Sequence, residues 1–284
     1  MKYITDLHYG PAERQVVDLC LPDGASGDTG LVLFIHGGAW VAGDKKYHEK
    51  DTADIAEKCG CAAAAMNYRY LSLRVRMSDI VDDITSALSA LKDEAKKRGV
   101  NLNKVLFTGI SAGAHLSMLY AYRYADISPI EPAAVVSRCG PADLADENFY
   151  NGTLADMPVK SVARLFAFGG GIRTADFMVM SPEERALAVK PFSPICHVSK
   201  NSVPTVLAQG LKDTIVPYTN AISMNTALEE YGVPHRLITY PNSGHGLDKD
   251  PDQNEKTGAL LIEYAKSMCN QQCALCNYEL GTQN

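Results

Sequence analysis

Short runs of apolar residues alternate along this chain with longer segments in which apolar side chains recur every three or four positions. Residues 31–35 form an unbroken apolar run, which is typical of a strand covered by helices on both faces. Residues 78–98 place apolar side chains on one helical stripe, and Gly99 follows as a residue that can end the helix in a left-handed conformation. The pattern therefore predicts strands and helices in alternation.

The same reading of the chain predicts the remaining elements. Further strands are predicted over residues 14–21, 61–66, 105–107, 133–138, 205–209 and 236–240. Further helices are predicted over residues 47–58, 114–124, 218–231 and 256–268, and a polar, glycine-rich loop over residues 23–30. This alternation favours an α/β fold, a doubly wound, mostly parallel sheet with helices on both faces, and ligands then bind at the carboxyl ends of the strands. We expect one domain over residues 1–284.

Residues 141–191 interrupt the alternation and are predicted to form a short, cap-like insertion over the carboxyl edge of the sheet. The sequence Ser-Pro-Glu-Glu at residues 181–184 predicts the start of a short helix, and the three glycines at residues 169–171 predict a hinge or a tight bend. Aromatic residues of the insertion, with Trp40 facing them, either form the walls of a substrate pocket or only fasten the insertion to the sheet. These residues are Phe149, Tyr150, Phe166, Phe168 and Phe177.

Charge and composition argue against several classes of partner. The formal net charge is −6 with both signs interspersed, and no basic cluster suggests a nucleic-acid partner. No apolar run approaches the roughly 18 residues of a membrane span, so no membrane partner is expected. Residues 1–10 lack the basic and apolar regions of a signal peptide. We therefore expect a cytoplasmic protein, with secretion as the alternative if a leader has been removed.

The chain has eight cysteines, and several lie in apolar segments, as is typical of reduced thiols in a cytosolic protein. Cys269, Cys273 and Cys276 have a spacing that resembles a metal or iron–sulfur motif. No fourth ligand is near them in the sequence, and they follow a complete domain. We therefore expect a solvated or helical tail there, and neither a metal nor a cofactor.

The sequence Gly-Ile-Ser-Ala-Gly at residues 109–113 stands between a predicted strand and a predicted helix. Gly-x-Ser-x-Gly in this setting is typical of a nucleophile elbow. The glycines leave room for a strained turn, and the following helix N-terminus favours developing negative charge. We therefore predict Ser111 as a nucleophile at the carboxyl edge of the sheet.

A serine nucleophile needs a base, and seven histidines compete for this role. His245 lies in a glycine-containing loop after a predicted strand, where it can reach Ser111. His115 lies on the helix after Ser111 and should point away from the hydroxyl. His36 is expected to brace the loop that follows it, and His235 begins a strand at the wrong edge of the sheet. The pattern favours His245.

The base needs an acid that orients it, and this acid should follow a strand between Ser111 and His245. Asp213 occupies such a loop, after the strand predicted to end at residue 209. Asp143 and Asp248 are its rivals. The chain order serine, aspartate, histidine is the order that this architecture uses, and it favours Asp213.

The sequence His-Gly-Gly-Ala-Trp at residues 36–40 follows the apolar strand. Acyl transfer develops a negative oxygen that backbone N–H groups can stabilise, and glycines let the backbone approach this oxygen closely. We expect the N–H groups of Gly37, Gly38 and Ala112 to form the oxyanion hole, with Trp40 beside the substrate. The alternative is an ordinary glycine-rich turn.

These motifs, together with Asn-Tyr-Arg-Tyr at residues 67–70 and Ser-Gly-His-Gly at residues 243–246, resemble those of an α/β-hydrolase of the esterase/lipase group. The resemblance is closest to the acetylesterase- and feruloyl-esterase-like (BD-FAE-like) branch, which also resembles the arylformamidases. It extends over residues 31–246 in family order. Ala39 and Ile110 depart from the hormone-sensitive-lipase-like members, which often have glycine and aspartate there.

The residues and the resemblance imply a serine carboxylic-ester hydrolase that acts on a small-molecule ester. We expect acetyl to butyryl esters to be preferred, with acetylated sugars or aromatic esters as candidate substrates. An amidase, arylformamidase or peptidase would use the same three residues. A non-catalytic binding protein on this fold and a cysteine-ligated metal protein are the alternatives from other classes, and the complete set of catalytic residues argues against the binding protein.

Overall fold

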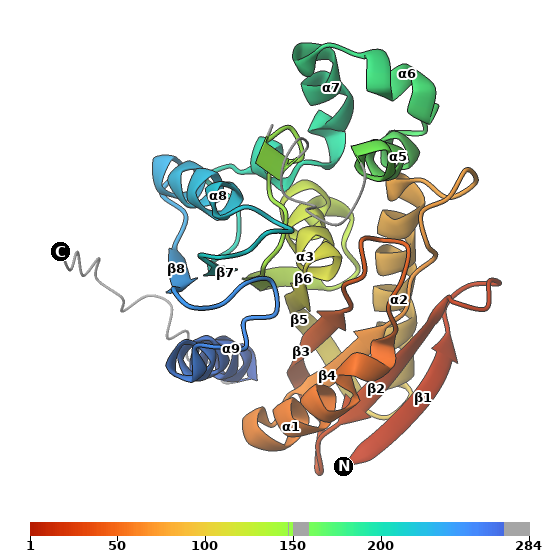
Figure 1. Cartoon of the computed structure of the whole chain (residues 1–284). Helices are drawn as coiled ribbons and strands as arrows, with labels where there is room; N and C mark the ends of the chain where they lie inside the picture. The colour runs from red at the N-terminus through yellow and green to blue at the C-terminus, as the bar shows by residue number, and fades with distance from the viewer. Residues whose placement is uncertain (147, 150–158, 270–284) are drawn as a thin grey trace.

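The structure is a computed structural model and describes residues 1–146, 148–149 and 159–269. A central sheet carries helices on both faces (Figure 1). In this part of the chain the sheet has eight strands in the order β1-β2-β4-β3-β5-β6-β7-β8. The strands are β1 Lys2–His8, β2 Val16–Leu21, β3 Gly27–Ile35, β4 Ala62–Met66, β5 Val100–Ile110, β6 Glu131–Arg138, β7 Thr205–Gly210 and β8 His235–Tyr240.

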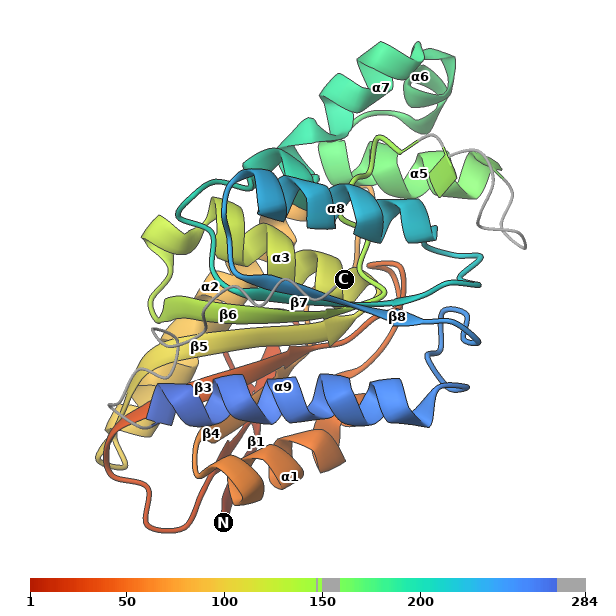
Figure 2. The same cartoon turned by 90° about the vertical axis from the view of Figure 1, so that its left-hand side faces the viewer.

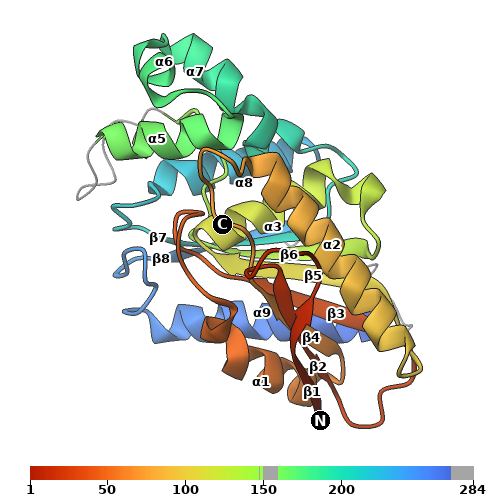
Figure 3. The same cartoon turned by 90° about the vertical axis from the view of Figure 1, so that its right-hand side faces the viewer.

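The sheet is mixed but mostly parallel. β2 pairs antiparallel with both β1 and β4, and the pairs from β4 through β3, β5, β6 and β7 to β8 are all parallel. Figure 3 is seen from the edge where β1 and β2 lie. The predicted α/β class and mostly parallel sheet are confirmed.

Helices cover the sheet in two layers, with α1 and α9 on one face and α2, α3 and α8 on the other (Figure 2). No helix in the described residues is both long and apolar enough to cross a membrane. The α-helices are α1 Glu49–Cys59, α2 Met77–Lys96, α3 Ala112–Arg123, α5 Val159–Gly170, α6 Thr174–Val179, α7 Pro182–Val189, α8 Tyr218–Glu230 and α9 Pro251–Cys269. Short 3-10 helices are η1 Lys45–His48, η2 Ala125–Ile127, η3 Lys190–Phe192 and η4 Pro194–His197.

The unbroken apolar run in β3 is explained by two separate cores. Leu31, Leu33 and Ile35 point into the core on one face of the sheet. Val32 and Phe34 point into the core on the other face. Since successive side chains of a strand point to opposite faces, a strand buried on both sides has no polar positions to spare.

Three strands differ from the prediction because their polar ends carry no apolar signal. β1 was not predicted, and most of its residues are exposed at the edge of the sheet. β3 begins at Gly27, within the predicted loop, and β5 is much longer than residues 105–107. In these extensions the side-chain amide of Asn101 donates to the carboxylate of Asp28 at 2.6 Å, so a polar cross-strand pair replaces apolar packing.

Where the structure describes the predicted insertion, it contains helices α5, α6 and α7, at the top of Figure 2. Ser181 and Glu184 form the reciprocal capping bonds predicted for the start of α7. Of the three glycines predicted to form a hinge or a tight bend, only Gly171 lies outside the helix. Gly169 and Gly170 belong to α5, and Gly171, with φ of +69°, follows it as the left-handed stop.

Candidate active site

Ser111 occupies a sharp turn between β5 and α3, where its φ and ψ are 55° and −123°. The Ser111 N–H donates to the carbonyl oxygen of Arg138 at 2.8 Å. A Cβ atom on Gly109 would lie 2.5 Å from the Ile35 carbonyl oxygen, and a Cβ on Gly113 would lie 1.9 Å from it. Only glycine at both positions allows β3 to approach the turn this closely. The local structure is therefore the predicted strand, tight turn and helix, with Ser111 at the turn.

His245 and Asp213 are joined by a hydrogen bond of 2.8 Å between the ring Nδ1 and the carboxylate Oδ2. The Asp213 side chain is fully buried, and 21% of the His245 side chain is exposed. The other carboxylate oxygen accepts from the N–H groups of Ile215 and Val216, at 2.8 and 3.0 Å. Gln209, whose role the sequence did not suggest, donates to Oδ2 at 2.9 Å. The carboxylate is thereby fixed in place, and it fixes the imidazole.

These contacts also decide the charge of the acid. Burial alone would raise the pKa of Asp213, but the hydrogen bond and charge of His245 and the two backbone donors outweigh burial and hold this pKa below its usual value. Asp213 is therefore ionised at neutral pH and accepts the Nδ1 proton of His245. The ring Nε2 is then the nitrogen that can accept another proton.

The loop that carries His245 is braced by a second aspartate, Asp250. Its carboxylate accepts from the Ser243 hydroxyl at 2.5 Å and from the Asn242 side-chain amide at 2.8 Å. No motif marks Asp250, because its partners become neighbours only when the loop closes on itself. It is a positioning residue that sequence reasoning missed.

The rival aspartates do not contact His245. Asp143 accepts from the backbone N–H of Ala145 at 2.8 Å, which is a local turn contact. Asp248 is exposed, and in the described residues no hydrogen bond joins it to His245. The geometry therefore favours Asp213 over both.

His36 braces the loop that follows it, as predicted. Its Nε2 accepts from the Arg14 guanidinium at 3.2 Å, and its Nδ1 donates to the Gly37 carbonyl at 2.7 Å. The ring stacks on Tyr68 with centroids 4.3 Å apart. Burial lowers the pKa of His36 to about 4, so the ring is neutral at neutral pH.

His115 points away from Ser111, as predicted, and connects two other segments. Its Nε2 donates to the Phe192 carbonyl at 2.7 Å, and its Nδ1 accepts from the Trp40 indole N–H at 3.1 Å. These bonds join the loop after β3 to the end of the insertion. The remaining candidate, His235, begins β8 at the amino edge of the sheet, and its Nδ1 lies 2.7 Å from the Val233 carbonyl.

The glycine loop after β3 lies against the elbow. A Cβ atom on Gly37 would lie 2.9 Å from the Ile110 carbonyl oxygen and 3.4 Å from the Ser111 Cβ. Gly38 has φ of +113°, and a Cβ there would lie 2.2 Å from the Ala42 carbonyl oxygen. Ala112 is the first residue of α3, so its N–H has no partner within the helix. Gly37 and Ala112 therefore lie beside the serine, and Gly38 follows Gly37 in the same loop.

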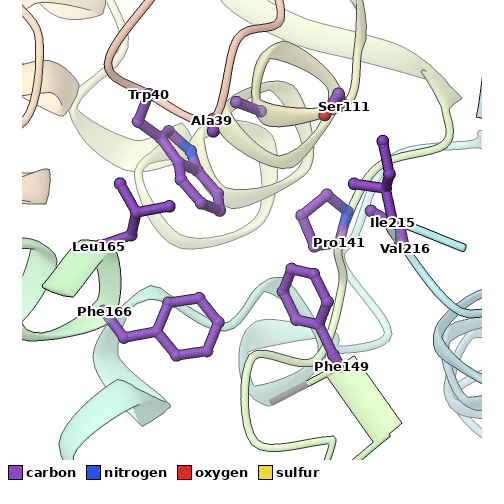
Figure 4. Close-up of a pocket in the computed structure, with 10 residues that line it drawn as sticks. Ala39, Trp40, Ser111, Pro141, Phe149, Leu165, Phe166, Ile215 and Val216 are labelled. Carbon is purple, nitrogen blue, oxygen red and sulfur yellow. The ribbon is translucent and has the colours of Figure 1, made fainter. Parts of the chain in front are cut away.

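An apolar pocket opens beside Ser111 and encloses about 370 Å³ of empty space, counted to its open mouth. Figure 4 shows Trp40 and the insertion residues Leu165, Phe166 and Phe149 around it. The full lining is Ala39, Trp40, Ser111, Ala112, Pro141, Phe149, Leu165, Phe166, Ile215 and Val216.

The aromatic residues of the insertion therefore divide between the two predicted roles. Phe149 and Phe166 line the pocket. Phe168 and Phe177 are buried and only pack the insertion, and the ring of Phe177 meets Phe166 edge-on at 6.3 Å. Tyr150 lies outside the described residues.

The serine and the histidine share this site without a direct bond. Ile215 and Val216, whose N–H groups hold Asp213, line the same pocket as Ser111. Within the residues that the structure describes, no hydrogen bond joins the Ser111 hydroxyl to His245. Such bonds often shorten only when substrate is bound.

Cys139 is a further neighbour of the acid that the sequence did not reveal. It follows β6 with φ of +50°, and its buried thiol lies within 4.8 Å of the Asp213 carboxylate. Burial, and then the charge of Asp213, raise the pKa of this thiol, so it stays protonated. The side-chain atoms of Cys139, Asp213 and His245 that could ligate a metal ion lie within 4.8 Å of one another. Those of Asp213 and His245 are already joined to each other by a hydrogen bond.

Comparison with known proteins gives one family and a consistent fold. Residues 17–228 match the BD-FAE family. The chain is 25% identical over 250 residues to a probable isoprenylcysteine alpha-carbonyl methylesterase, ICMEL1, of Arabidopsis thaliana, with 84% of this chain and 49% of that protein covered. It is 28% identical over 252 residues to a probable carboxylic ester hydrolase, LipM, of Mycobacterium tuberculosis, with 83% and 53% covered. The chain thus spans about half the length of the curated relatives it matches.

Solved structures share the fold over nearly the whole chain. A truncated carbohydrate esterase from gut microbiota aligns with a TM-score of 0.73 at 21% identity, over 94% of this chain and 97% of that one. Esterase B from Lactobacillus rhamnosis aligns with a TM-score of 0.72 at 22% identity, over 93% and 84%. The family match covers most of the sequence, so the chain belongs to the BD-FAE family of α/β-hydrolase esterases.

Proposed function

We propose that this protein hydrolyses carboxylic esters, with Ser111 as the nucleophile, His245 as the general base and Asp213 as the acid that orients the base. The observation that carries the proposal is the 2.8 Å bond between His245 and a fully buried Asp213, beside a strained serine at the end of β5. A strained backbone at the elbow and a carboxylate with four donors are both costly to build for structure alone.

The reaction follows from the proton positions. With Nδ1–H donated to Asp213, the Nε2 of His245 accepts the hydroxyl proton as the oxygen of Ser111 attacks the ester carbonyl carbon. His245 then returns this proton to the leaving alcohol, and an acyl-enzyme remains. A water molecule that gives its proton to His245 attacks the acyl carbon, and the free acid departs.

The N–H groups of Gly37, Gly38 and Ala112 are proposed to bind the negative oxygen of each tetrahedral intermediate. Their support is positional, because Gly37 packs beside Ser111, where a Cβ atom would stand only 2.9 Å from the Ile110 carbonyl oxygen. One such donor is worth about 3 kcal/mol of transition-state stabilisation. The chemistry needs no metal ion or cofactor.

The pocket is proposed to take a short acyl group. Its walls are apolar, and the bulky side chains of Trp40, Leu165 and Phe166 stand around it, which suits an acyl chain of a few carbons. An esterase 2 from Thermogutta terrifontis, which shares this fold at a TM-score of 0.68, has been solved with propionate bound. We propose acetyl to butyryl esters as substrates, on an alcohol that is a sugar or an aromatic group.

Specificity is tested by kcat/KM for esters of increasing acyl length, with acetylated sugars and an aryl formamide in the same panel. We expect a maximum between two and four carbons. Leu165→Ala, which widens the pocket wall, should move the maximum toward longer acyl groups. A steady rise beyond eight carbons would contradict the short pocket, and faster turnover of the formamide would favour an arylformamidase.

The catalytic assignment is tested separately with Ser111→Ala and His245→Ala. Each should lower kcat for ester hydrolysis by ~10⁴ or more, because the members of a triad act as one unit. A fluorophosphonate should label Ser111, and the label should be lost in Ser111→Ala.

Two matched controls use residues away from the pocket, Ser89→Ala on the exposed side of α2 and His235→Ala at the start of β8. Both should keep wild-type turnover. Full activity in Ser111→Ala, or labelling of another serine, would refute the assignment.

A further inference from the structure

Three cysteines that the catalytic proposal does not use meet at the opposite edge of the sheet. Cys59 ends α1, Cys61 directly precedes β4, and Cys269 ends α9. Figure 2 shows α1 and α9 side by side on the same face of the sheet. Cys61 is fully buried, while Cys59 and Cys269 are half-buried. All three are free thiols, and they come from segments about 200 residues apart in the chain.

Close packing holds the end of α9 against the start of β4. Cys59, Met268 and Cys269 all pack against the buried cluster that contains Cys61. Leu31 pairs with Ala62 at the start of β4, and a Cβ atom on the preceding residue, Gly30, would stand only 2.6 Å from the Cβ of Met268. Cys61 is thus the middle member of the three, and Cys269 cannot move away without unpacking the end of the helix.

Contacts from β3 hold the sulfur of Cys269 on its other side. The Thr29 hydroxyl lies 3.7 Å from this sulfur. Cys59 has its own separate contact, with its sulfur 4.0 Å from the Ile262 carbonyl oxygen. The sulfur of Cys269 is therefore held near β3, whereas Cys59 is directed toward α9.

The three thiols differ in acidity because of this arrangement. The interaction with the Cys61 thiol, with further contributions from Gly30 and Thr29, outweighs burial and lowers the pKa of Cys269 to about 6. The interactions with Cys269 and Cys59, together with burial, raise the pKa of Cys61. A thiol that favours the thiolate form is thus packed near one that stays protonated, a pairing from which a disulfide can form.

We propose that Cys269 is a modification site for hydroperoxides and that its oxidation ends in a disulfide with Cys61. The Cys269 sulfur attacks one oxygen of hydrogen peroxide and forms a sulfenic acid as the O–O bond breaks. The hydroxide that is released takes up a proton and leaves as water. The Cys61 sulfur then attacks the sulfenic sulfur. Its own proton leaves with the hydroxyl group as a second water, and two thiols have been oxidised to one disulfide.

The position of this site separates it from catalysis. The cysteines lie at the amino ends of β3 and β4, whereas Ser111 follows the carboxyl end of β5, so the bond would not touch the pocket. A disulfide here ties α9 to the sheet through a very long loop, which restricts the unfolded chain. We therefore expect a higher thermal midpoint after oxidation, with ester hydrolysis unchanged.

The test is mild hydrogen peroxide treatment of the full-length folded protein, followed by mass spectrometry without reduction. We expect a loss of about 2 Da and one cross-linked peptide pair that joins Cys61 to Cys269. In Cys61→Ser the resolving thiol is missing, and dimedone should trap a sulfenic acid on Cys269. A double variant, Cys273→Ser with Cys276→Ser, should leave the Cys61–Cys269 bond intact.

Cys196 is the matched control, because it is the exposed residue among the described cysteines. Partial burial of its sulfur atom raises the pKa of its thiol. At pH 6.5 Cys269 should react with iodoacetamide roughly tenfold faster than Cys196 despite its lower exposure, since its larger thiolate fraction outweighs its lower nucleophilicity. By pH 9 this order should reverse. Faster reaction of Cys196 at both pH values, a cross-link that joins Cys59 to Cys61, or one that joins Cys269 to Cys273 or Cys276, would overturn the proposal.

Discussion

Acid should destabilise this protein well above the pH at which carboxylates titrate, and His115 should account for much of the effect. Its ring is fully buried, with Nδ1 accepting from the Trp40 indole and Nε2 donating to the Phe192 carbonyl. A proton added at Nδ1 would face the indole N–H, so the folded protein keeps this ring neutral. Burial, only partly offset by the Phe192 carbonyl, lowers the pKa of His115 from 6.5 to about 4.

The direction and the size of the stability change follow from the difference between the pKa of His115 in the unfolded and the folded protein. Below pH 6.5 the unfolded chain binds a proton that the folded protein does not, so the stability present at neutral pH is lost as the pH falls toward 4 and levels off below it. Integration between the two pKa values gives a loss of about 2 kcal/mol between pH 7.5 and pH 5 for this one residue. His36, with a pKa also lowered by burial to about 4, should add a similar loss.

Urea unfolding at 25 °C, at several pH values from 7.5 to 5, measures the effect in wild type and in His115→Gln. Glutamine keeps a donor and an acceptor but does not ionise. Trp40, the single tryptophan of the chain, and circular dichroism give two independent signals. The free energy of unfolding should fall between pH 7.5 and pH 5 by about 2 kcal/mol less in the variant than in wild type. His8→Gln, at an exposed position on β1, should follow wild type. Parallel curves for His115→Gln and wild type, within about 0.5 kcal/mol, would refute the reasoning.

Two further predictions concern the acid of the proposed triad. Asp213→Asn should lower kcat by ~10⁴, as in other enzymes where this change fixes the wrong imidazole tautomer, while Asp143→Asn and Asp248→Asn should stay near wild type; near-normal turnover of Asp213→Asn would show that the acid is misassigned. Cys139→Ala removes the thiol that lies beside the Asp213 carboxylate and should lower kcat/KM about fivefold, the value of one ordinary hydrogen bond, whereas Cys139→Ser keeps a polar hydrogen there and should recover most of the loss; equal losses in both variants would point to packing alone.

The sequence was sufficient for the features that depend on neighbours along the chain. The elbow at Ser111 needs two glycines within five residues, and the double burial of β3 needs only an unbroken apolar run, so both could be predicted. Asp250 and Cys139 act on residues that folding brings close to them, and single-chain patterns carry no trace of such contacts. Likewise β1 was missed, because an exposed edge strand shows little apolar periodicity.

One wall of the pocket and the proposed catalytic groups come from different parts of the chain. Leu165 and Phe166 belong to α5 of the insertion, whereas Ser111, Asp213 and His245 stand on loops at the ends of strands. Changes in α5 should therefore alter which acyl group fits without disturbing the proposed catalytic groups. Substrate preference can thus diverge among relatives through this helix alone, and residues 159–170 are a segment to exchange when a different preference is wanted.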